Sequence, residues 1–303
     1  MNISQAMSGL MVVVCVIVPL ALAWKLWRLD EPSFPGWLLV ALDTVAFFLL
    51  VILVGRWDIA GLWTRLVLVG LVLVAASVSL VRHARRPWRV PKGSQFWVRH
   101  MTTGVSLTLF SAALAYSLTG FAKPEHSRSL AFPLERGHFV IAQGGSIGLL
   151  NHHAGHRAQR YALDITATND AGFRSKSILP SDPASYSIFG ASVISPCEGT
   201  VISVKDGLPD LPPPKTDRAN AAGNHVVLSC NGMQVELAHF RQGSIQVRSR
   251  TPVSVGQRLG QVGNSGNSTE PHLHIHAVDP ATGAGIPVLF DGRNPTRNTA
   301  FRR

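Results

Sequence analysis

The chain has 303 residues, of which 46% are apolar and only 15% are charged, and its mean hydropathy is +0.20. These values exclude a disordered protein and are not those of an ordinary cytosolic enzyme, so part of the chain is expected to lie in lipid. Residues 1–121 carry 10 Lys and Arg, 4 Asp and Glu and 2 of the 12 histidines, and the rest carry 18, 13 and 10 of them. We therefore expect a membrane domain over 1–121 and a soluble part of about 180 residues, enough for a core of its own.

Four apolar stretches of the membrane domain approach the ~20 residues that cross a bilayer as a helix. They cover residues 8–24, 36–55, 62–81 and 101–121. The last stretch is rich in Ser and Thr, so a helix lying on the membrane surface is its alternative, although such residues are ordinary where membrane helices pack. Asp43 falls inside the second stretch, and we interpret it as structural, reaching the interface or bonding a neighbouring helix.

The charges of the loops predict the orientation, because Lys and Arg are retained on the cytoplasmic side. Residues 82–99 hold six of them, whereas the second-to-third connection has only Arg56 and Arg65. With four spans, everything after residue 121 is then outside, which predicts a multi-pass protein of the inner (plasma) membrane with a periplasmic or extracellular C-terminal domain. Residues 21–23 (Ala-Leu-Ala) resemble a signal-peptidase site, but residues 1–10 lack Lys and Arg, and cleavage would place the basic loop outside.

The soluble part is divided into a connector over 122–136, a β domain over 137–290 and a tail over 291–303. Short runs of β-branched and aromatic residues alternate with turn signals, and helical periodicity is almost absent, so a mainly antiparallel β domain is predicted. The expected strands cover 138–142, 161–167, 192–194, 200–204, 225–230, 233–239, 244–247, 258–262 and 272–278. We interpret the proline-rich residues 206–223 as a tolerated insertion in preference to the border of a cleft.

Candidate chemistry concentrates in the segment 270–276, Glu-Pro-His-Leu-His-Ile-His. Residues i, i+2 and i+4 of a strand share a face, so His272, His274 and His276 can point into one groove. Zinc binding or proton transfer is the usual reason for such a face, and a catalytic zinc takes three protein ligands. Candidate partners lie upstream: His152, His153, His156, Asp164 in an otherwise apolar strand, and His239 at a strand end.

Several separate motifs resemble, in this order and spacing, the lysostaphin/LytM-type zinc metallopeptidases. They are Asp164, the turn 195–201 (Ser-Pro-Cys-Glu-Gly-Thr-Val), Gly223-Asn224, Ala238-His239, Gly256-Gln257, the turn 263–266 (Gly-Asn-Ser-Gly) and 271–274 (Pro-His-Leu-His). The resemblance spans about residues 137–278 and does not cover the membrane domain. It implies a small antiparallel β fold with a groove and, as activity, endopeptidase cleavage of peptide cross-links in bacterial peptidoglycan.

Carried over by the motif, His274 and Asp164 are zinc ligands, and His239 and His272 are catalytic. The family usually shows His-x-x-x-Asp, but Arg160 stands four residues before Asp164, and a guanidinium does not bind zinc. The pattern Asn-His-His followed by Gln-Arg-Tyr-Ala-Leu-Asp resembles a branch with a short insertion between the two ligands.

In that branch the first ligand is expected to be His153, with His152 and then His156 as the next choices. His276 is expected either to support a ligand by a hydrogen bond or to be simply exposed.

The resulting hypothesis is a membrane-anchored, zinc-dependent metalloendopeptidase acting on peptidoglycan peptides or another peptide substrate. One alternative is an inactive peptidase-fold module that binds cell-wall peptide or activates another hydrolase; another is a membrane sensor. The expected partners are the substrate peptide, the lipid bilayer and a membrane protein bound by the four spans, with no nucleic acid. Cys197 and Cys230 both lie in the exported domain, where a disulfide between them is allowed but not required.

Overall fold

The computed structural model describes residues 9–90 and 94–303. The chain forms two compact units, one made of Leu10–Leu118 and one that includes Thr119–Arg303. Residue 8, with which the first predicted span begins, lies outside the described residues.

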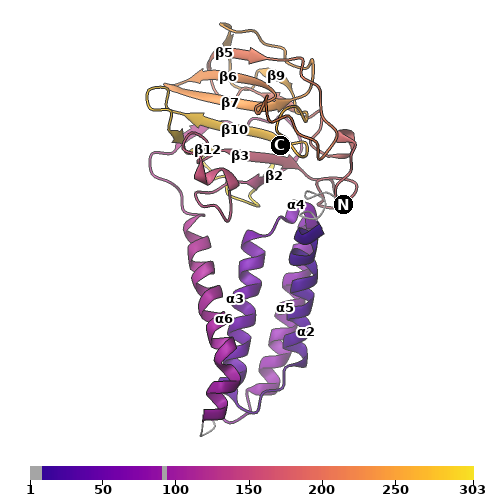
Figure 1. Ribbon diagram of the computed structural model, residues 1–303, viewed down its shortest axis with the longest axis vertical. Coiled ribbons are helices and arrows are strands. Elements are labelled where there is room, and N and C mark those ends of the chain that lie inside the picture. Colours follow the sequence, from indigo (N-terminus) through magenta and orange to yellow (C-terminus); the bar gives the residue numbers. More distant parts are fainter. Residues whose placement is uncertain (1–8, 91–93) are drawn as a thin grey trace. The chain divides into compact units, whose positions relative to one another are not determined.

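The first unit is helical (Figure 1). Its elements are a π-helical turn Val13–Ile17 and the α-helices α2 (Val18–Arg28), α3 (Phe34–Val54), α4 (Trp57–Ala60), α5 (Leu62–His83) and α6 (Ser94–Thr119). Ser33 caps α3, because its hydroxyl accepts a hydrogen bond from the amide of Gly36 at 3.3 Å. Within the described residues, four helices are long and apolar enough to cross a membrane: Gly9–Arg28, Phe34–Val54, Leu62–His83 and Gln95–Thr119. The described parts of all four predicted stretches therefore lie mainly in these helices.

The carboxylate of Asp43 connects three helices of this unit. It accepts hydrogen bonds from Lys25 Nζ on α2 at 3.2 Å and from Ser106 Oγ on α6 at 2.5 Å. The side chain is almost fully buried among the helices. This is the neighbour-bonding, structural role expected for an ionisable group in such a position.

The second unit is a β domain built on a nine-stranded antiparallel sheet (Figure 1). Its continuous order is β13 (Ala300–Arg302), β2 (His138–Gln143), β3 (Leu163–Ala167), β10 (Leu273–Val278), β7 (Met233–Phe240), β6 (Asn224–Cys230), β5 (Gly199–Lys205) and β8 (Pro252–Val253), with β11 (Gly285–Ile286) also paired to β10. Two small sheets pair β4 (Ser192–Ile194) with β9 (Arg258–Gln261), antiparallel, and β1 (Arg128–Leu130) with β12 (Val288–Phe290), parallel.

Strand β6 buries alternate side chains, as the period of a strand requires, whereas β3 is buried on both faces. In β6, Val226, Leu228 and Cys230 enter the core while Ser229 is exposed. Cys230 forms a disulfide with Cys197, with a Cα–Cα distance of 6.0 Å. The pairing that the sequence left open is thus present.

The strand prediction was wrong at one segment and missed five short strands, which are β1, β8, β11, β12 and β13. The segment 244–247 is not a strand, because it keeps only isolated contacts to β9, such as the bond from the Gln246 amide to the Leu259 carbonyl at 2.8 Å. Conversely, β1 lies in the predicted connector and β13 in the predicted tail, and both pair with strands of the β domain.

Candidate metal centre

The candidate site lies at the middle of the large sheet, on strands β3, β10 and β7. Strand β10 lies between the other two, and His274 is in register with Asp164 on one side and with Ala238 on the other. Because facing residues of neighbouring strands have side chains on the same face, this register brings the histidine and the carboxylate together. His239 follows Ala238 at the end of β7.

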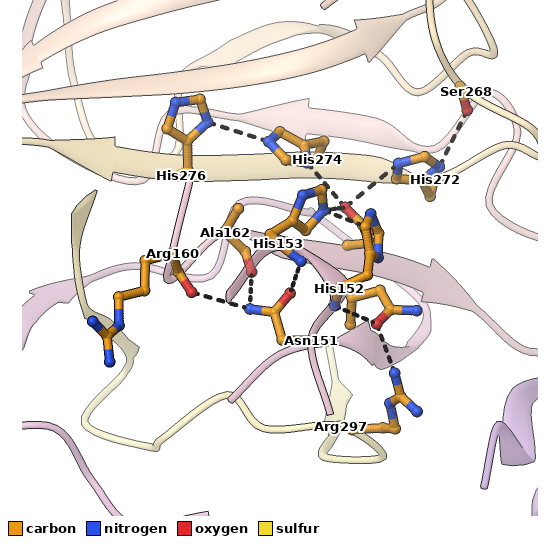
Figure 2. A network of polar contacts seen from close by, with 12 residues as sticks. Asn151, His152, His153, Arg160, Ala162, Ser268, His272, His274, His276 and Arg297 are labelled. Atoms are coloured by element: carbon orange, nitrogen blue, oxygen red, sulfur yellow. Dashed lines mark hydrogen bonds and ion pairs between the residues drawn. The ribbon is translucent and has the colours of Figure 1, made fainter. Parts of the chain in front are cut away.

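His274 uses its two ring nitrogens in different directions (Figure 2). Its Nδ1 lies 2.9 Å from Asp164 Oδ1, and its Nε2 lies 3.2 Å from Nδ1 of His276. His276 is 8% exposed and shares the face of His274, so of the two expectations for His276 the structure favours contact with a ligand over plain exposure. His272, which precedes β10, places Nε2 3.5 Å from the same Asp164 oxygen.

The segment before β3 brings a third candidate ligand to this carboxylate. His153 Nε2 lies 3.1 and 3.2 Å from the two oxygens of Asp164. The local fold places it there: the short 3₁₀ helix His152–Gly155 is capped by Asn151, whose side chain accepts a bond from the His153 amide at 3.1 Å. The amide group of Asn151 also donates to the carbonyls of Gly145 and Ala162, which fastens the turn to β3.

The other two upstream histidines and Arg160 take different positions. The ring of the exposed His152 lies against that of His153, with centroids 3.8 Å apart and the planes tilted by 39°, and belongs to the same polar cluster. His156 is exposed, and its backbone amide closes the 3₁₀ turn by donating to the His153 carbonyl. The guanidinium of Arg160 lies over the ring of Tyr161 at 5.7 Å.

The two contacts of Asp164 with His153 and His274 have lengths that suit atoms sharing one zinc ion. Two atoms bound to one zinc at 2.0–2.1 Å with tetrahedral angles lie about 3.3 Å apart. The contacts from Asp164 to His153 and His274 measure 2.9–3.2 Å, and imidazole and carboxylate are donors that zinc accepts. Among the described residues, two groups could hold a metal: His239, His272 and His274, and His152, His153 and Asp164, with the atoms of each group within 4.8 Å of one another.

The titration of the central groups agrees with this chemistry. Burial alone would raise the pKa of Asp164, but the nearby His272 and the contacts with His153 and His274 outweigh it and hold that pKa well below its usual value. Burial lowers the pKa of His274 to about 4, although Asp164 opposes the shift. At neutral pH the site therefore presents a carboxylate and a neutral imidazole, the forms that bind metal.

His239 and His272 are oriented in the same manner. Each ring has Nδ1 2.8 Å from a backbone carbonyl, that of Ser265 for His239 and that of Glu270 for His272. A carbonyl can only accept, so Nδ1 of each ring carries a proton. Burial, followed by the neighbouring His272 and His274, lowers the pKa of His239 well below its ordinary value, which keeps this imidazole neutral.

The backbone of His239 has a positive φ of 66°, a conformation that costs free energy for a side chain other than glycine. Its amide donates to the Ala222 carbonyl at 3.1 Å, and its carbonyl accepts from the Gly263 amide at 2.9 Å. The surrounding loops therefore hold the residue on both sides in this conformation.

The loop 206–223 borders the site. The Leu211 amide donates to the Asn264 carbonyl at 3.1 Å and the Asp217 amide to the Gly266 carbonyl at 2.8 Å. Gly223 packs so closely on the turn that a Cβ there would lie 2.4 Å from the Ser265 backbone oxygen. The interpretation as a mere insertion was therefore wrong: the loop supports the turn that carries the two carbonyl acceptors.

Some contributors to the site were absent from the sequence-based prediction. Ser268 donates from Oγ to the Glu270 carbonyl at 2.8 Å, and buried Arg174 pairs with the Glu270 carboxylate. Ser268 stands close to the His-Leu-His motif, and this proximity could have drawn attention to it. Arg174 lies 96 residues from Glu270 in sequence, and no motif around Arg174 indicates that it belongs to the site.

In the described residues, four apolar helices are thus followed by a mostly antiparallel β domain, which carries a cluster of His and Asp side chains that could hold a metal ion. This β fold is of the class seen in metallopeptidases. Residues 185–283 match the sequence profile of Peptidase family M23, and this match includes His239, His272 and His274. Comparison with curated proteins gave no significant match.

Similar solved structures include a zinc-containing peptidase from Vibrio cholerae, at 21% identity over 53% of this chain and 39% of that one, with a TM-score of 0.34. The catalytic domain of the antimicrobial peptidase lysostaphin from Staphylococcus simulans is 21% identical over 33% of this chain and 68% of that one, with a TM-score of 0.25. A putative peptidase M23 from Pseudomonas aeruginosa is 16% identical over 66% and 62%, with a TM-score of 0.31.

Proposed function

We propose that this protein is a membrane-anchored, zinc-dependent metalloendopeptidase that hydrolyses peptide bonds, with cross-linking peptides of peptidoglycan as its substrate. The observation that carries the proposal is the convergence of His153, His274 and Asp164, with contacts of 2.9–3.2 Å. A buried carboxylate is costly unless partners compensate its charge, and a metal ion among these side chains would supply such a partner. The match to Peptidase family M23 supports peptide hydrolysis as the use of this cluster.

His153, Asp164 and His274 would hold the zinc ion, through Nε2, the carboxylate and Nδ1. Bound zinc would polarise the scissile carbonyl and lower the pKa of water toward about 7. His152 and His156 remain the second choices, and His153 is preferred because its Nε2 lies 3.1 and 3.2 Å from the two carboxylate oxygens.

The two remaining histidines would manage protons and charge on the reacting groups. Nδ1 of each ring donates to a carbonyl, so Nε2 of the neutral ring would carry the lone pair. One nitrogen is then in the correct state to take a proton from water, and after protonation that ring can donate to the developing oxyanion or to the leaving amine. Their ring centroids are 4.8 Å apart, so both can reach one scissile bond.

The four apolar helices would span the inner membrane and anchor the β domain on the periplasmic or extracellular side, where cell-wall peptide is found. The basic residues of 82–99 support this orientation. In spheroplasts, added protease should digest the β domain and spare the loop 82–99. Cleavage restricted to that loop would refute the orientation.

The test of the enzymatic proposal is zinc content and hydrolysis by the full chain in detergent. We expect about one zinc per chain and cleavage of peptidoglycan peptides, both lost in His153→Ala and His274→Ala. His152→Ala and His156→Ala should keep zinc, and His138→Ala, an exposed histidine of β2, is the matched control.

Each contrary result has a distinct meaning. If His152→Ala or His156→Ala loses zinc and His153→Ala keeps it, the first ligand is that other histidine and not His153. A folded protein without zinc would refute the proposal, and zinc without hydrolysis would leave a peptide-binding module.

A further inference from the structure

The turn between β9 and β10 holds both proton-handling histidines through its backbone. The carbonyl of Ser265 accepts from His239 and the carbonyl of Glu270 accepts from His272, each at 2.8 Å. Any displacement of this turn would therefore move or rotate both imidazoles. The residues that fix the turn are candidates for setting the geometry of the reaction.

Arg174 reaches this turn from the loop after β3. Its Nε donates to Glu270 Oε2 at 2.9 Å, and its Nη2 donates both to the same oxygen and to the Ile178 carbonyl at 3.3 Å. The guanidinium also lies 5.7 Å from the ring centroid of Tyr186. The cation is thus held on several sides, so it offers a rigid anchor to the Glu270 carboxylate.

The burial of this ion pair calls for an explanation other than stability. The side chain of Arg174 is only 2% exposed and that of Glu270 is 17% exposed. Removing two charges from water is costly, so a buried ion pair is weak evidence of stabilisation, and an apolar pair of the same volume often stabilises as well. A defined orientation is what such a pair supplies and an apolar contact does not.

The orientation is transmitted within a single residue. Pro271 disfavours the helical region for the backbone of Glu270, so this residue has few backbone conformations to choose from. Fixing the Glu270 side chain therefore also fixes the direction of its carbonyl. That carbonyl accepts hydrogen bonds from His272 Nδ1 and from Ser268 Oγ, each at 2.8 Å. Ser268 Oγ is also 2.8 Å from Asn264 Oδ1, which ties the carbonyl end of the turn to its beginning.

We propose that Arg174 is a positioning residue, which acts through Glu270 to hold His272 in the Nδ1–H tautomer with Nε2 directed at the reacting groups. The proposal rests on the proposed function only where hydrolysis is measured. Arg174 itself touches neither the candidate zinc ligands nor the reacting atoms. A merely structural role would be the fastening of the loop 169–178 to the sheet, with no effect on the tautomer of His272.

The experiment uses the full chain in detergent, loaded with zinc and labelled with ¹⁵N in its histidines. The variants are Arg174→Met, Arg174→Lys, Glu270→Gln and the double variant Arg174→Met with Glu270→Gln. Tyr186→Phe is the matched control, because it removes the hydroxyl bond to the Pro180 carbonyl at 3.2 Å but leaves the ring beside Arg174. The readouts are thermal unfolding, zinc content, kcat and KM on peptidoglycan peptides, and the tautomer of His272 at one fixed pH.

We expect Arg174→Met to bind one zinc and to keep KM, while kcat falls by up to about 100-fold, the cost of a small misplacement of a reacting group. Its His272 signal should change from the Nδ1–H tautomer to a mixture. Arg174→Lys should recover part of kcat. Because two partners of one interaction act as a unit, the double variant should lose no more than either single variant.

Several results would overturn the proposal. They are an Nε2–H tautomer of His272 in the wild type, an unchanged tautomer and kcat in folded Arg174→Met, or an equal loss in Tyr186→Phe. If Arg174→Met does not fold, Glu270→Gln, which preserves volume, answers the same question. If the wild type cleaves no peptide but Arg174→Met still changes the tautomer, the peptidase proposal fails while the positioning role stands.

Discussion

Replacing His276 should weaken zinc binding although this residue is not an expected ligand. His274 directs Nδ1 to Asp164 and Nε2 to His276 Nδ1 at 3.2 Å. When Nδ1 binds a metal, Nε2 carries the proton and donates it to His276. A partner of this kind fixes the ring orientation and raises the basicity of the ligand.

The size of the effect follows from burial. His274 and His276 are 4% and 8% exposed, so His276→Ala leaves the His274 N–H with no acceptor in a place that water reaches poorly. A buried donor without a partner costs about 1–3 kcal/mol. We therefore expect zinc affinity to fall about 10–100-fold, the range typical of lost partners of metal ligands.

The assay is competition for zinc between the full chain in detergent and chelators of graded affinity. His276→Phe should lose as much affinity as His276→Ala, because it restores volume but no acceptor. His276→Gln should lose less, because its amide oxygen can accept the bond. If the phenylalanine and alanine variants bind zinc as tightly as the wild type, His274 is not supported through Nε2 and the argument is wrong.

Three further predictions concern the β domain. The disulfide between Cys197 and Cys230 closes 33 residues, so its removal should cost about 3.7 kcal/mol in the free energy of unfolding, and equal denaturation curves with and without reductant would contradict this. Gly223→Ala should destabilise the domain by more than the ~1–3 kcal/mol that a positive φ costs alone, because its Cβ would also clash with the backbone. In the control Gly232→Ala the Cβ meets no atom within 4 Å, so only the cost of the positive φ is expected. Equal shifts of the melting temperature in the two variants would disprove the clash. Burial, and then the Glu270 carboxylate, raise the pKa of Tyr186, so the folded state keeps the phenol proton to a higher pH than the unfolded state does. The contribution of this group to the free energy of unfolding is therefore full below about pH 10 and should be lost as the pH rises beyond it. In Tyr186→Phe the free energy of unfolding should fall less steeply over this range.

Much of the architecture could be predicted from the sequence because its signal is local. Apolar stretches of about 20 residues mark helices that can cross a membrane, and alternation marks strands such as β6 and β7. The short strands β1, β8, β11, β12 and β13 have two or three residues each. Such runs have no period to detect, and they exist because a partner strand supplies hydrogen bonds.

The candidate site divides in the same manner. In the His-Leu-His motif, the two-residue period of a strand puts His272 and His274 on the same face. The sequence by itself therefore predicted that these two side chains lie together. It could only rank His153 above its neighbours, and the Asn151 cap, which turns the 3₁₀ helix toward Asp164, emerges only with the tertiary fold.

The contacts that orient the imidazoles lie still further from what a sequence can express. The Ser265 carbonyl is 26 residues from His239, and Arg174 is 96 residues from Glu270. Residue types and local spacing determined which groups are available, namely the apolar helices and the candidate metal-binding side chains. Which nitrogen of His239 and of His272 contacts the backbone was decided by the tertiary structure, because hydrogen-bond directions exist only after strands from distant parts of the chain have paired.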